Sequence, residues 1–388
     1  MMNKRIYLDN AATTCIDDGV IKEMMPYLSG NYGNASSLHY YGTVVKEIIQ
    51  SSRKKIANYV NAKPEELIFT GSGTEANNFA LKGIAFANRE KGNHIIVSLI
   101  EHDCVLNACY WLEKQGFYIT FLPVDKFGVI DLDLLQRCIN KKTILVSVMH
   151  ANNEIGTIQP IKEIGKICKN KNVYFHTDAC QSFGKIPIDV EMQNIDLLTI
   201  NSHKIYGPKG IGALYIRKGV KIDSLLHGGG QELGLRSSTE NTPAIVGFAK
   251  AAELCFDNLD NETIRLEYLR KKIVNYLSDN VEGIYFNGHP SQRLSNIINF
   301  CISGMEGEGI KILLLLDEKG IAVSAGSACS SNDKSSASHV LQAIGLNQFE
   351  ARGSIRISLG RFNNDDDIQN LVAMLSQTIH QLNPIFSC

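Results

Sequence analysis

The fold is decided by the stretch Leu197-Leu198-Thr199-Ile200-Asn201-Ser202-His203-Lys204-Ile205-Tyr206-Gly207-Pro208. An apolar segment ends in polar residues and a lysine, and a turn with glycine and proline follows. This pattern predicts a buried strand at 197–201 whose carboxyl end presents Lys204. Most lysines are solvated surface residues, but one fixed at a strand end and partly shielded from water is suited to covalent chemistry with a carbonyl compound. The neighbouring sequence decides between these interpretations.

Around this stretch, short apolar segments alternate with segments of helical periodicity. Strands are predicted at 66–70, 94–98, 118–123, 143–149, 173–177, 197–201 and 213–217. Helices are predicted at 76–88, 104–115 and 161–169. This alternation is typical of an α/β fold, in which a mainly parallel sheet is covered by helices on both faces.

The rest of the chain indicates a second, smaller unit. A helical segment at 242–278 is followed by strands near 295–302 and 354–359 and by helices at 308–319 and 365–382, which is an α+β pattern. A length of 388 residues favours two domains. We therefore expect a large α/β domain at 15–257 and a small α+β domain formed by 1–14 and 258–388. Its serine-rich segment 324–338 is expected to be a mobile loop.

Composition excludes several classes of protein. The formal net charge is −1, so binding to nucleic acid is not expected. The sequence contains no apolar run long enough to span a membrane and no recognisable signal peptide, and we expect a soluble cytoplasmic protein without a membrane partner. Ten cysteines occur without a C-x-x-C pair, which argues against a structural metal site or a disulfide framework.

Two motifs at predicted strand ends are typical of cofactor binding. The run Thr70-Gly71-Ser72-Gly73-Thr74-Glu75 leads from a strand into a helix, with capping-box spacing between Ser72 and Glu75. Such a helix N-terminus favours a phosphate group, although an ordinary capped helix would look the same. Asp178 follows the strand at 173–177, where a carboxylate could keep the nitrogen of a pyridine ring protonated. An aspartate capping the next helix is the alternative.

Three further polar residues follow or lie within predicted strands. His102 comes shortly after 94–98, where an imidazole could stack on a planar cofactor and transfer protons. Asn153 follows 143–149 and suits a hydrogen bond to a ring substituent, or simply to a turn. Arg356 lies in an alternating strand and would clamp a carboxylate if it faces inward. Facing outward, it would be a solvated edge residue.

Cys329 differs from the other cysteines because it lies in a small, polar, glycine-containing segment that offers no apolar core to fill. A thiol in such a segment is suited to act as a nucleophile.

Taken together, the motifs make the chain resemble the cysteine desulfurases of the NifS/IscS type, a branch of the fold-type I pyridoxal-phosphate enzymes in the class V aminotransferase family. The resemblance extends over nearly the whole chain, and its motifs occur in a fixed order. They are Tyr7-Leu8-Asp9-Asn10-Ala11-Ala12-Thr13-Thr14, Gly71-Ser72-Gly73-Thr74-Glu75, Glu101-His102, His150-Ala151-Asn152-Asn153-Glu154-Ile155-Gly156, Asp178-Ala179-Cys180-Gln181, Ser202-His203-Lys204, Arg236-Ser237-Ser238-Thr239 and Gly326-Ser327-Ala328-Cys329.

The resemblance implies pyridoxal 5'-phosphate as the cofactor and gives each motif a role. Lys204 would carry the cofactor, Asp178 would pair with the pyridinium nitrogen, and His102 would stack on the ring and act as acid and base. Gln181 and Asn153 would contact the ring hydroxyl and its surroundings.

The same resemblance implies a site for the cofactor's phosphate. Gly73, Thr74, Ser202 and His203 would hold it, with Thr239 reaching across from the second subunit of a homodimer. Three departures from the family pattern occur near these positions: Asn201 replaces a serine, and Leu233 and Ser238 alter the dimer-side segment.

For the substrate, the resemblance implies that Asn34 and Arg356 bind the carboxylate of L-cysteine. Lys204 would remove the Cα proton, and the Cys329 thiolate would attack the substrate sulfur, leaving a persulfide on the enzyme and releasing L-alanine. The persulfide would serve iron–sulfur cluster assembly or another thiolation, with an iron–sulfur scaffold or a tRNA-thiolation enzyme as acceptor. No resident metal is implied, although Cys329 could share a transient iron–sulfur cluster with a scaffold.

Other functions stay open at this point. A selenocysteine lyase or another pyridoxal-phosphate transaminase would use the same cofactor residues, with Cys329 incidental. A non-catalytic sulfur carrier could retain the fold without the reaction, but the presence of Lys204, Asp178, His102 and Cys329 argues against it.

Overall fold

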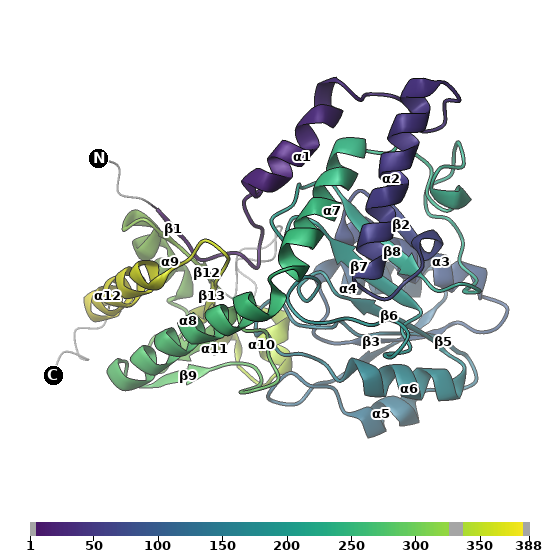
Figure 1. Ribbon diagram of the computed structural model, residues 1–388. Helices are drawn as coiled ribbons and strands as arrows, with labels where there is room; N and C mark the ends of the chain where they lie inside the picture. Colours follow the sequence, from purple (N-terminus) through teal and green to yellow (C-terminus); the bar gives the residue numbers. More distant parts are fainter. Residues whose placement is uncertain (1–4, 326–336, 383–388) are drawn as a thin grey trace.

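The computed structural model describes residues 5–325 and 337–382 (Figure 1). Its larger lobe is built on a seven-stranded sheet with the strand order β2-β8-β7-β6-β5-β3-β4. The strands are β2 (Leu67–Thr70), β3 (His94–Ser98), β4 (Tyr118–Leu122), β5 (Thr143–Ser147), β6 (Tyr174–Asp178), β7 (Leu197–Asn201) and β8 (Gly212–Ile216). Strands β4, β3, β5, β6 and β7 pair in parallel, while β8 runs antiparallel to both of its neighbours. The predicted mainly parallel α/β sheet is thus confirmed.

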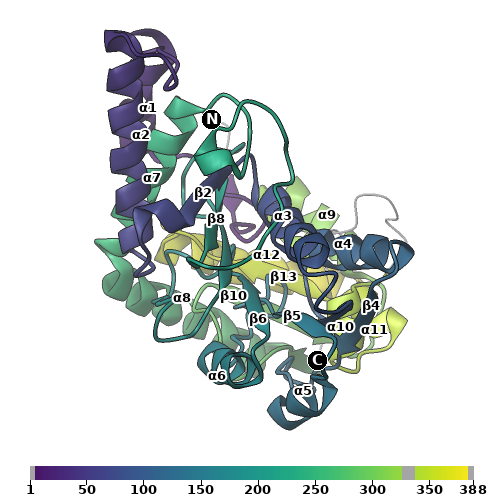
Figure 2. The ribbon, with the colours of Figure 1, turned by 90° about the vertical axis from the view of Figure 1, so that its right-hand side faces the viewer.

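Helices cover both faces of this sheet. One face packs against α1 (Asp18–Ser29), α2 (Tyr40–Asn58), α6 (Ile161–Lys171) and α7 (Thr242–Phe256), and the other against α3 (Gly73–Ala87) and α4 (Asp103–Lys114). Figure 2 shows α1, α2 and α7 together on one side and α3 and α4 on the other. Successive residues of a strand point to opposite faces. Accordingly Leu198 and Ile200 belong to the hydrophobic cluster on the face covered by α1, α2, α6 and α7, while Leu197 belongs to the cluster on the face covered by α3 and α4.

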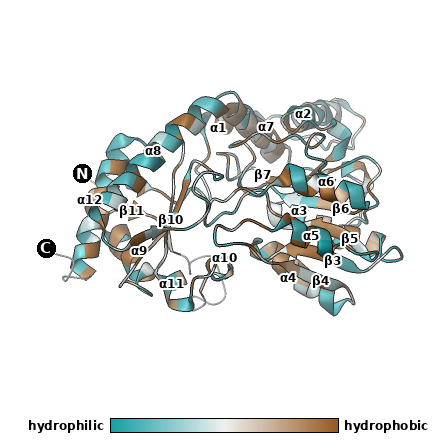
Figure 3. Ribbon diagram, turned by 90° about the horizontal axis from the view of Figure 1, so that it is seen from below, coloured by the Kyte–Doolittle hydropathy of each residue, from teal (hydrophilic) through white to brown (hydrophobic). Residues whose placement is uncertain are grey.

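The second lobe contains an antiparallel sheet with the order β12-β13-β10-β9. Its strands are β9 (Ile284–Phe286), β10 (Ile297–Ile302), β12 (Ser324–Ala325) and β13 (Ile355–Ser358), and a parallel pair joins β1 (Ile6–Tyr7) to β11 (Ile321–Ala322). Helices α8 (Leu259–Asn280), α9 (Gly309–Glu318) and α12 (Asp365–Leu382) bury their apolar residues against this sheet. In Figure 3, α8 and α12 carry both hydropathy colours, as amphipathic helices do.

Three short helices complete the described structure: α5 (Leu132–Cys138), α10 (His339–Ala343) and α11 (Gln348–Gly353). The helix-rich segment predicted at 242–278 consists of two helices, α7 and α8. No bounds were predicted from the sequence for α1, α2, α5, α10 and α11, of which α5, α10 and α11 are short and carry little periodicity. Within residues 5–325 and 337–382, no helix has the length and apolarity required to cross a membrane.

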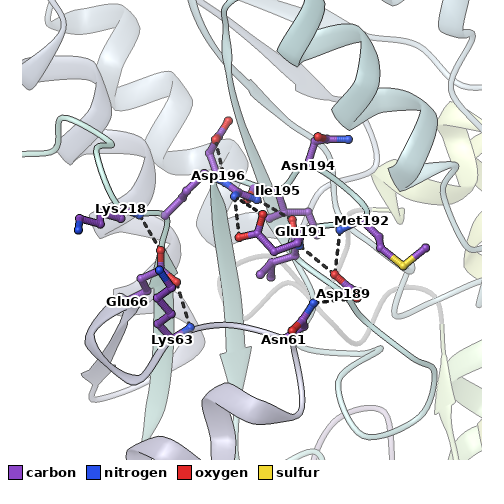
Figure 4. A network of polar contacts seen from close by, with 12 residues as sticks. Asn61, Lys63, Glu66, Asp189, Glu191, Met192, Asn194, Ile195, Asp196 and Lys218 are labelled. Atoms are coloured by element: carbon purple, nitrogen blue, oxygen red, sulfur yellow. Dashed lines mark hydrogen bonds and ion pairs between the residues drawn. The ribbon is translucent and has the colours of Figure 1, made fainter.

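The two sides of the large sheet at which its strands begin and end, called its edges here, carry different sets of residues. At the edge where β7 begins and β8 ends, a polar network joins connecting segments (Figure 4). There Asp189 accepts hydrogen bonds from Asn61 and from the amides of Glu191 and Met192, and Glu66 accepts one from the amide of Lys218. These contacts satisfy backbone and loop groups. The carboxyl ends of the parallel strands lie at the opposite edge, where the motif residues gather.

Candidate active site

Two adjoining cavities lie at the carboxyl ends of the strands. The larger, of about 600 Å³, is walled by residues of both lobes, including Lys204 from the large sheet and Arg356 from β13. The smaller, of about 180 Å³, contacts the N-terminus of α3 and the ends of β6 and β7. Both cavities have Ala12, His102, Asn153 and Lys204 in their walls. This is the position at which open α/β sheets bind ligands.

Lys204 is held by a tight turn that follows β7. The amides of Ile205 and Gly207 both donate to the Ser202 carbonyl, at 3.0 and 3.2 Å. Tyr206 has a left-handed backbone with φ of 67°, which is unfavourable for a bulky residue. Its amide donates to Thr14 Oγ1 at 2.8 Å, and its hydroxyl accepts from the Arg361 amide at 2.6 Å. These bonds hold the strained turn, and so fix the backbone that carries Lys204.

Asp178, the last residue of β6, is buried at the base of the smaller cavity. Burial by itself would raise the pKa of this carboxyl. Hydrogen bonds from the Cys180 amide, at 2.8 Å, and from Asn77, at 2.6 Å, act in the opposite direction, as does the charge of Lys204. Their combined effect lowers the pKa of Asp178 below its ordinary value, so the cavity contains a buried carboxylate.

His102 is the N-cap of α4, and its Nδ1 accepts from the amide of Cys104 at 3.2 Å. Desolvation, and next the charge of Lys204, lowers the pKa of His102. The ring is therefore a neutral imidazole near pH 7, with Nε2 carrying the proton because Nδ1 is the acceptor. A neutral planar ring is suited to stacking and to proton transfer.

The N-terminus of α3 forms one end of the smaller cavity. The Ser72 hydroxyl caps it by accepting from the amide of Glu75 at 3.1 Å, as predicted. The predicted capping box is otherwise wrong: the Glu75 carboxylate accepts from the Gly71 amide and pairs with Arg236 at 2.7 Å instead of reaching Ser72. Gly73 has no room for a side chain, because a Cβ there would lie 2.7 Å from the Cys180 sulfur. The amides of this first turn have no partners within the helix, and they suit an anion.

Asn201 and His203 lie beside this helix end. The Asn201 side-chain amide faces His203 Nε2 at 3.3 Å, and His203 Nδ1 lies 3.1 Å from the Thr13 hydroxyl. Desolvation, followed by the charges of Lys204 and Lys209, lowers the pKa of His203 to about 4, so this imidazole is neutral. The unusual Asn201 thus orients His203. Ser202 is not a wall residue of either cavity; it is buried, with its hydroxyl against Gly207.

Arg356 faces inward, which resolves the alternatives that the sequence left open. It is 3% exposed and lies in the wall of the larger cavity. Its guanidinium donates to the Asn153 carbonyl at 3.0 Å and forms an ion pair with Asp9 at 2.8 Å. Its planar guanidinium is suited to binding a carboxylate through two hydrogen bonds.

The smaller cavity contains polar groups without protein partners. Among the described residues, the buried Oδ1 atoms of Asn77 and Asn201 make no hydrogen bond. A neutral imidazole, a buried carboxylate, a lysine and free helix amides surround the same space. This donor and acceptor set fits an anionic, aromatic aldehyde such as pyridoxal phosphate, which needs an amine, a carboxylate opposite a ring nitrogen and an anion site.

Two buried glutamates were missed as site residues. Glu101 lies in the wall of the larger cavity and accepts from the Met149 amide at 2.6 Å, while burial, and next the charge of Asp178, raises its pKa well above the ordinary value. Glu154 accepts from Ser338 at 2.6 Å, and burial raises its pKa too. Each adjoins a residue that the motifs had singled out, His102 or Asn153, and this adjacency was the available signal.

Besides Ser202, three predicted site residues are not part of these cavities as described. Asn34 is exposed and uses its side-chain oxygen to accept from the Ser36 amide. Thr239 lines a separate hollow beside Arg236. Cys329 lies outside the described residues. Residues flanking its segment on either side, Ser324 and Ala337, both lie in the wall of the larger cavity.

Comparison with known proteins identifies the class of protein that this fold and site define. The model of the family described as aminotransferase class-V matches residues 6–371. The chain therefore belongs to the class-V aminotransferase family, in its branch of pyridoxal-phosphate-dependent cysteine desulfurases.

Individual relatives support this assignment. The chain is 50% identical over 380 residues to "Cysteine desulfurase IscS" of Methanosarcina thermophila, which covers 98% of this chain and 93% of the relative. It is 48% identical over 382 residues to the protein of that name in Clostridium botulinum, covering 98% and 96%. Among solved structures, a "NIFS-LIKE PROTEIN" matches with a TM-score of 0.91 and 37% identity, covering 97% of this chain and 100% of that one.

A further similar structure is that of a complex with cysteine. "SspA in complex with cysteine" matches with a TM-score of 0.81 and 38% identity, covering 92% of this chain and 100% of that one.

Proposed function

We propose that this protein removes sulfur from L-cysteine, releases L-alanine and holds the sulfur as a persulfide on Cys329. The observation that carries the proposal is the convergence of Lys204, Asp178, His102 and Arg356 on two cavities that share wall residues. Identity of about 50% to cysteine desulfurases over nearly the whole chain supports the same reaction.

The cofactor residues are assigned as follows. Lys204 would bind pyridoxal phosphate covalently, Asp178 would pair with the pyridine nitrogen, and His102 would stack on the ring. Gln181 and Asn153 contact the ring's oxygen substituent. When bound, the cofactor supplies an electron sink that makes the Cα–H bond of the amino acid acidic.

The phosphate is assigned to the polar groups beside α3. Gly73 and Thr74 contribute the amides of the helix N-terminus, and His203, oriented by Asn201, contributes its ring. Ser202 and Thr239 complete the set, with Thr239 supplied by the second subunit. The lowered pKa of His203 excludes a cation near pH 7, so its ring would contact the phosphate as a neutral imidazole.

In the larger cavity the chain's own residues bind and convert the substrate. Arg356, oriented by Asp9 and Asn153, binds the carboxylate of L-cysteine, and Asn34 is the second expected carboxylate ligand. The amine of Lys204 moves the Cα proton, and the neutral imidazole of His102 is available to accept or donate a proton near pH 7. The Cys329 thiolate then attacks the substrate sulfur, so the Cβ–S bond breaks as an S–S bond forms. A proton added at Cβ yields L-alanine.

The protein is proposed to act as a homodimer. Helices α1 and α2 and the segment between them expose a set of large apolar side chains: Ile21, Met25, Leu28, Tyr32, Leu38, Tyr40 and Tyr41. Leu38 is fully exposed and Tyr32 is 71% exposed. The rings of Tyr32 and Tyr40 both contact that of Tyr41. Exposed apolar patches mark interfaces, and a second copy of the chain is also what the assignment of Thr239 requires.

We further propose a cytoplasmic location and delivery of the persulfide sulfur to an acceptor protein. An iron–sulfur scaffold and a tRNA-thiolation enzyme are both compatible with the chemistry, since either accepts sulfur from a persulfide. A shared transient cluster at Cys329 belongs to the first of these. The domain division at residues 15 and 257 is also proposed, and separate hydrophobic clusters in the two lobes support it.

Replacement of Cys329 tests the function. Cys329→Ser should bind the cofactor and L-cysteine normally, while alanine formation falls by more than about a hundredfold, because a hydroxyl is a poor nucleophile at neutral pH. Cys15→Ser, at an exposed cysteine, is the matched control and should be unaffected. Mass spectrometry of the wild-type enzyme should find one added sulfur atom on Cys329. Near-normal turnover in Cys329→Ser would instead favour a selenocysteine lyase or a transaminase.

A further inference from the structure

Lys185 lies in the turn after β6, where it has no acidic partner. It is half-buried, and among the described residues no carboxylate lies within ion-pair distance of its amine. Its ammonium donates instead to two oxygens of one residue, the Gln181 carbonyl at 2.9 Å and the Gln181 Oε1 at 3.4 Å. Desolvation, and next the charge of Lys204, lowers the pKa of Lys185 to about 7. Removing a lysine ammonium from water without a carboxylate partner costs stability, so we expect this position to serve a function.

The contacts of Lys185 define the orientation of the Gln181 side chain. An ammonium group only donates, so the atom that faces Lys185 must be the amide oxygen. On its other side the amide meets the Ala11 carbonyl at 2.8 Å, and a carbonyl only accepts, so that atom must be Nε2. Gln181 is 3% exposed and lies in the wall of the smaller cavity with Asp178 and Lys204. The second N–H of its amide remains available on that side.

Lys185 itself does not line either of the two active-site cavities. It borders a separate enclosed space of about 30 Å³ behind Lys204, next to Cys255 and Arg361. Lys185 therefore does not contact a ligand in the active-site cavities directly. Its hydrogen bonds link it to the smaller cavity through Gln181, and its charge also acts on Lys204.

We propose that Lys185 is a positioning residue for the cofactor: it holds the Gln181 amide so that the oxygen points away from the smaller cavity and an N–H group is available to the cofactor's ring oxygen. The inference rests on the proposed contact between Gln181 and the ring. It adds a residue that determines how well this contact forms.

A double-mutant cycle tests the proposal, with the dissociation constant of pyridoxal phosphate as the measured quantity. Lys185→Met and Gln181→Leu should each weaken binding by about two- to tenfold, the range expected for one hydrogen bond. The dissociation constant of the double variant should exceed that of the weaker-binding single variant by no more than about twofold, since both substitutions remove the same contact. Lys91→Met removes a lysine that donates to the Asn172 carbonyl elsewhere, and is the matched control.

The other outcomes overturn the inference. Losses that multiply in the double variant would mean that Lys185 acts independently of Gln181, and unchanged binding in Lys185→Met would mean that it does not act on the cofactor. Unchanged binding in Gln181→Leu would remove the proposed Gln181 contact, and the inference with it, without touching the Cys329 result. If Lys185→Met does not fold, Lys185→Arg against Lys185→Gln gives the same comparison, because only Arg keeps a charged donor.

Discussion

The chemistry at the residue scale depends on charges placed close to one another with little water between them. Asp178 remains a carboxylate although it is buried, because the Cys180 amide and Asn77 donate to it. His102 and His203 both become neutral. The cavities therefore hold a buried anion near Lys204, together with imidazoles that do not compete with it for positive charge.

The assignment of Lys204 leads to a first prediction. Lys204→Ala should fold and bind pyridoxal phosphate without a covalent bond, because Lys204 is the lysine in the walls of both cavities. Borohydride reduction and peptide mapping should find a pyridoxyl group on Lys204 in the wild type and none in the variant. Lys209→Ala, at an exposed lysine five residues away, should label as the wild type does. A label on Lys209 or another lysine would contradict the assignment.

A second prediction concerns Arg356. Arg356→Lys keeps the charge but loses the planar fork that binds a carboxylate through two hydrogen bonds. We expect the KM for L-cysteine to rise by about ten- to a hundredfold, the equivalent of one charged hydrogen bond, with the cofactor absorbance unchanged. Arg217→Lys, at the opposite edge of the large sheet, should leave KM as it is. An unchanged KM in Arg356→Lys would show that another group binds the carboxylate.

At the scale of the elements, strand ends bring polar residues together. Glu101 follows β3, and Glu154 follows β5, the next strand in the sheet. Both acids are buried, and burial raises both pKa values. Glu154 accepts from Ser338, directly before α10, and His339 in α10 donates to the Glu101 carbonyl at 2.9 Å. These contacts tie the short helix that follows the Cys329 segment to the strand ends of the larger lobe.

The raised pKa of Glu101 makes stability depend on pH. The folded state keeps the proton to a higher pH than the unfolded chain, whose glutamates ionise near pH 4.3. The wild type therefore loses stability as the pH rises above about 4.3, until the folded-state pKa is passed. Glu101→Gln has no such loss. The difference in the free energy of unfolding, Glu101→Gln minus wild type, should become more positive as the pH rises, by up to about 1.4 kcal/mol per pH unit.

Urea unfolding of the cofactor-free protein at pH 5 and pH 8 measures this difference. Glu90→Gln, at an exposed glutamate, controls for the removal of a carboxyl group from the surface. A difference between Glu101→Gln and wild type that is the same at both pH values would refute the prediction.

At the scale of the whole molecule, the active site requires both lobes. Arg356 and Ser324 reach the larger cavity from the second lobe, and Lys204 and His102 reach it from the first. The N-terminal segment links them, because β1 pairs with β11 of the second lobe while Thr14 accepts from the turn after Lys204. Residues near the N-terminus and in the second lobe, which are distant in sequence, thus meet at one site.

The proposed dimer provides the prediction at this scale. Leu38→Asp places a charge on a fully exposed apolar position, so it should not disturb the fold of one subunit, but it should be unfavourable in an interface. Sedimentation should show a dimer for the wild type and a shift toward monomer for the variant, with weaker retention of pyridoxal phosphate because Thr239 of the second subunit is lost. Ile264→Asp, on α8 and 70% exposed, is the control. A wild-type monomer with full cofactor retention would contradict the dimer.

Much of the large lobe follows from the sequence alone. Strands β3 and β7 have the bounds predicted for them, because a strand buried on both faces is a nearly continuous apolar run. The motif residues at strand ends were predictable for a different reason, because parallel strands carry their functional residues at the carboxyl ends. Local pattern thus identified Lys204, Asp178 and His102.

Tertiary structure decided the properties that depend on neighbours distant in the chain. The sequence could not place Arg356 inward, because alternation in a strand does not say which face meets the core; pairing with β10 and the contact with Asp9 do. Nor could it show that Glu75 pairs with Arg236, that Asn201 orients His203, or that Lys185 donates to Gln181. Burial and the sum of surrounding charges set these pairings and the protonation of each group, and both quantities exist only once the chain has folded.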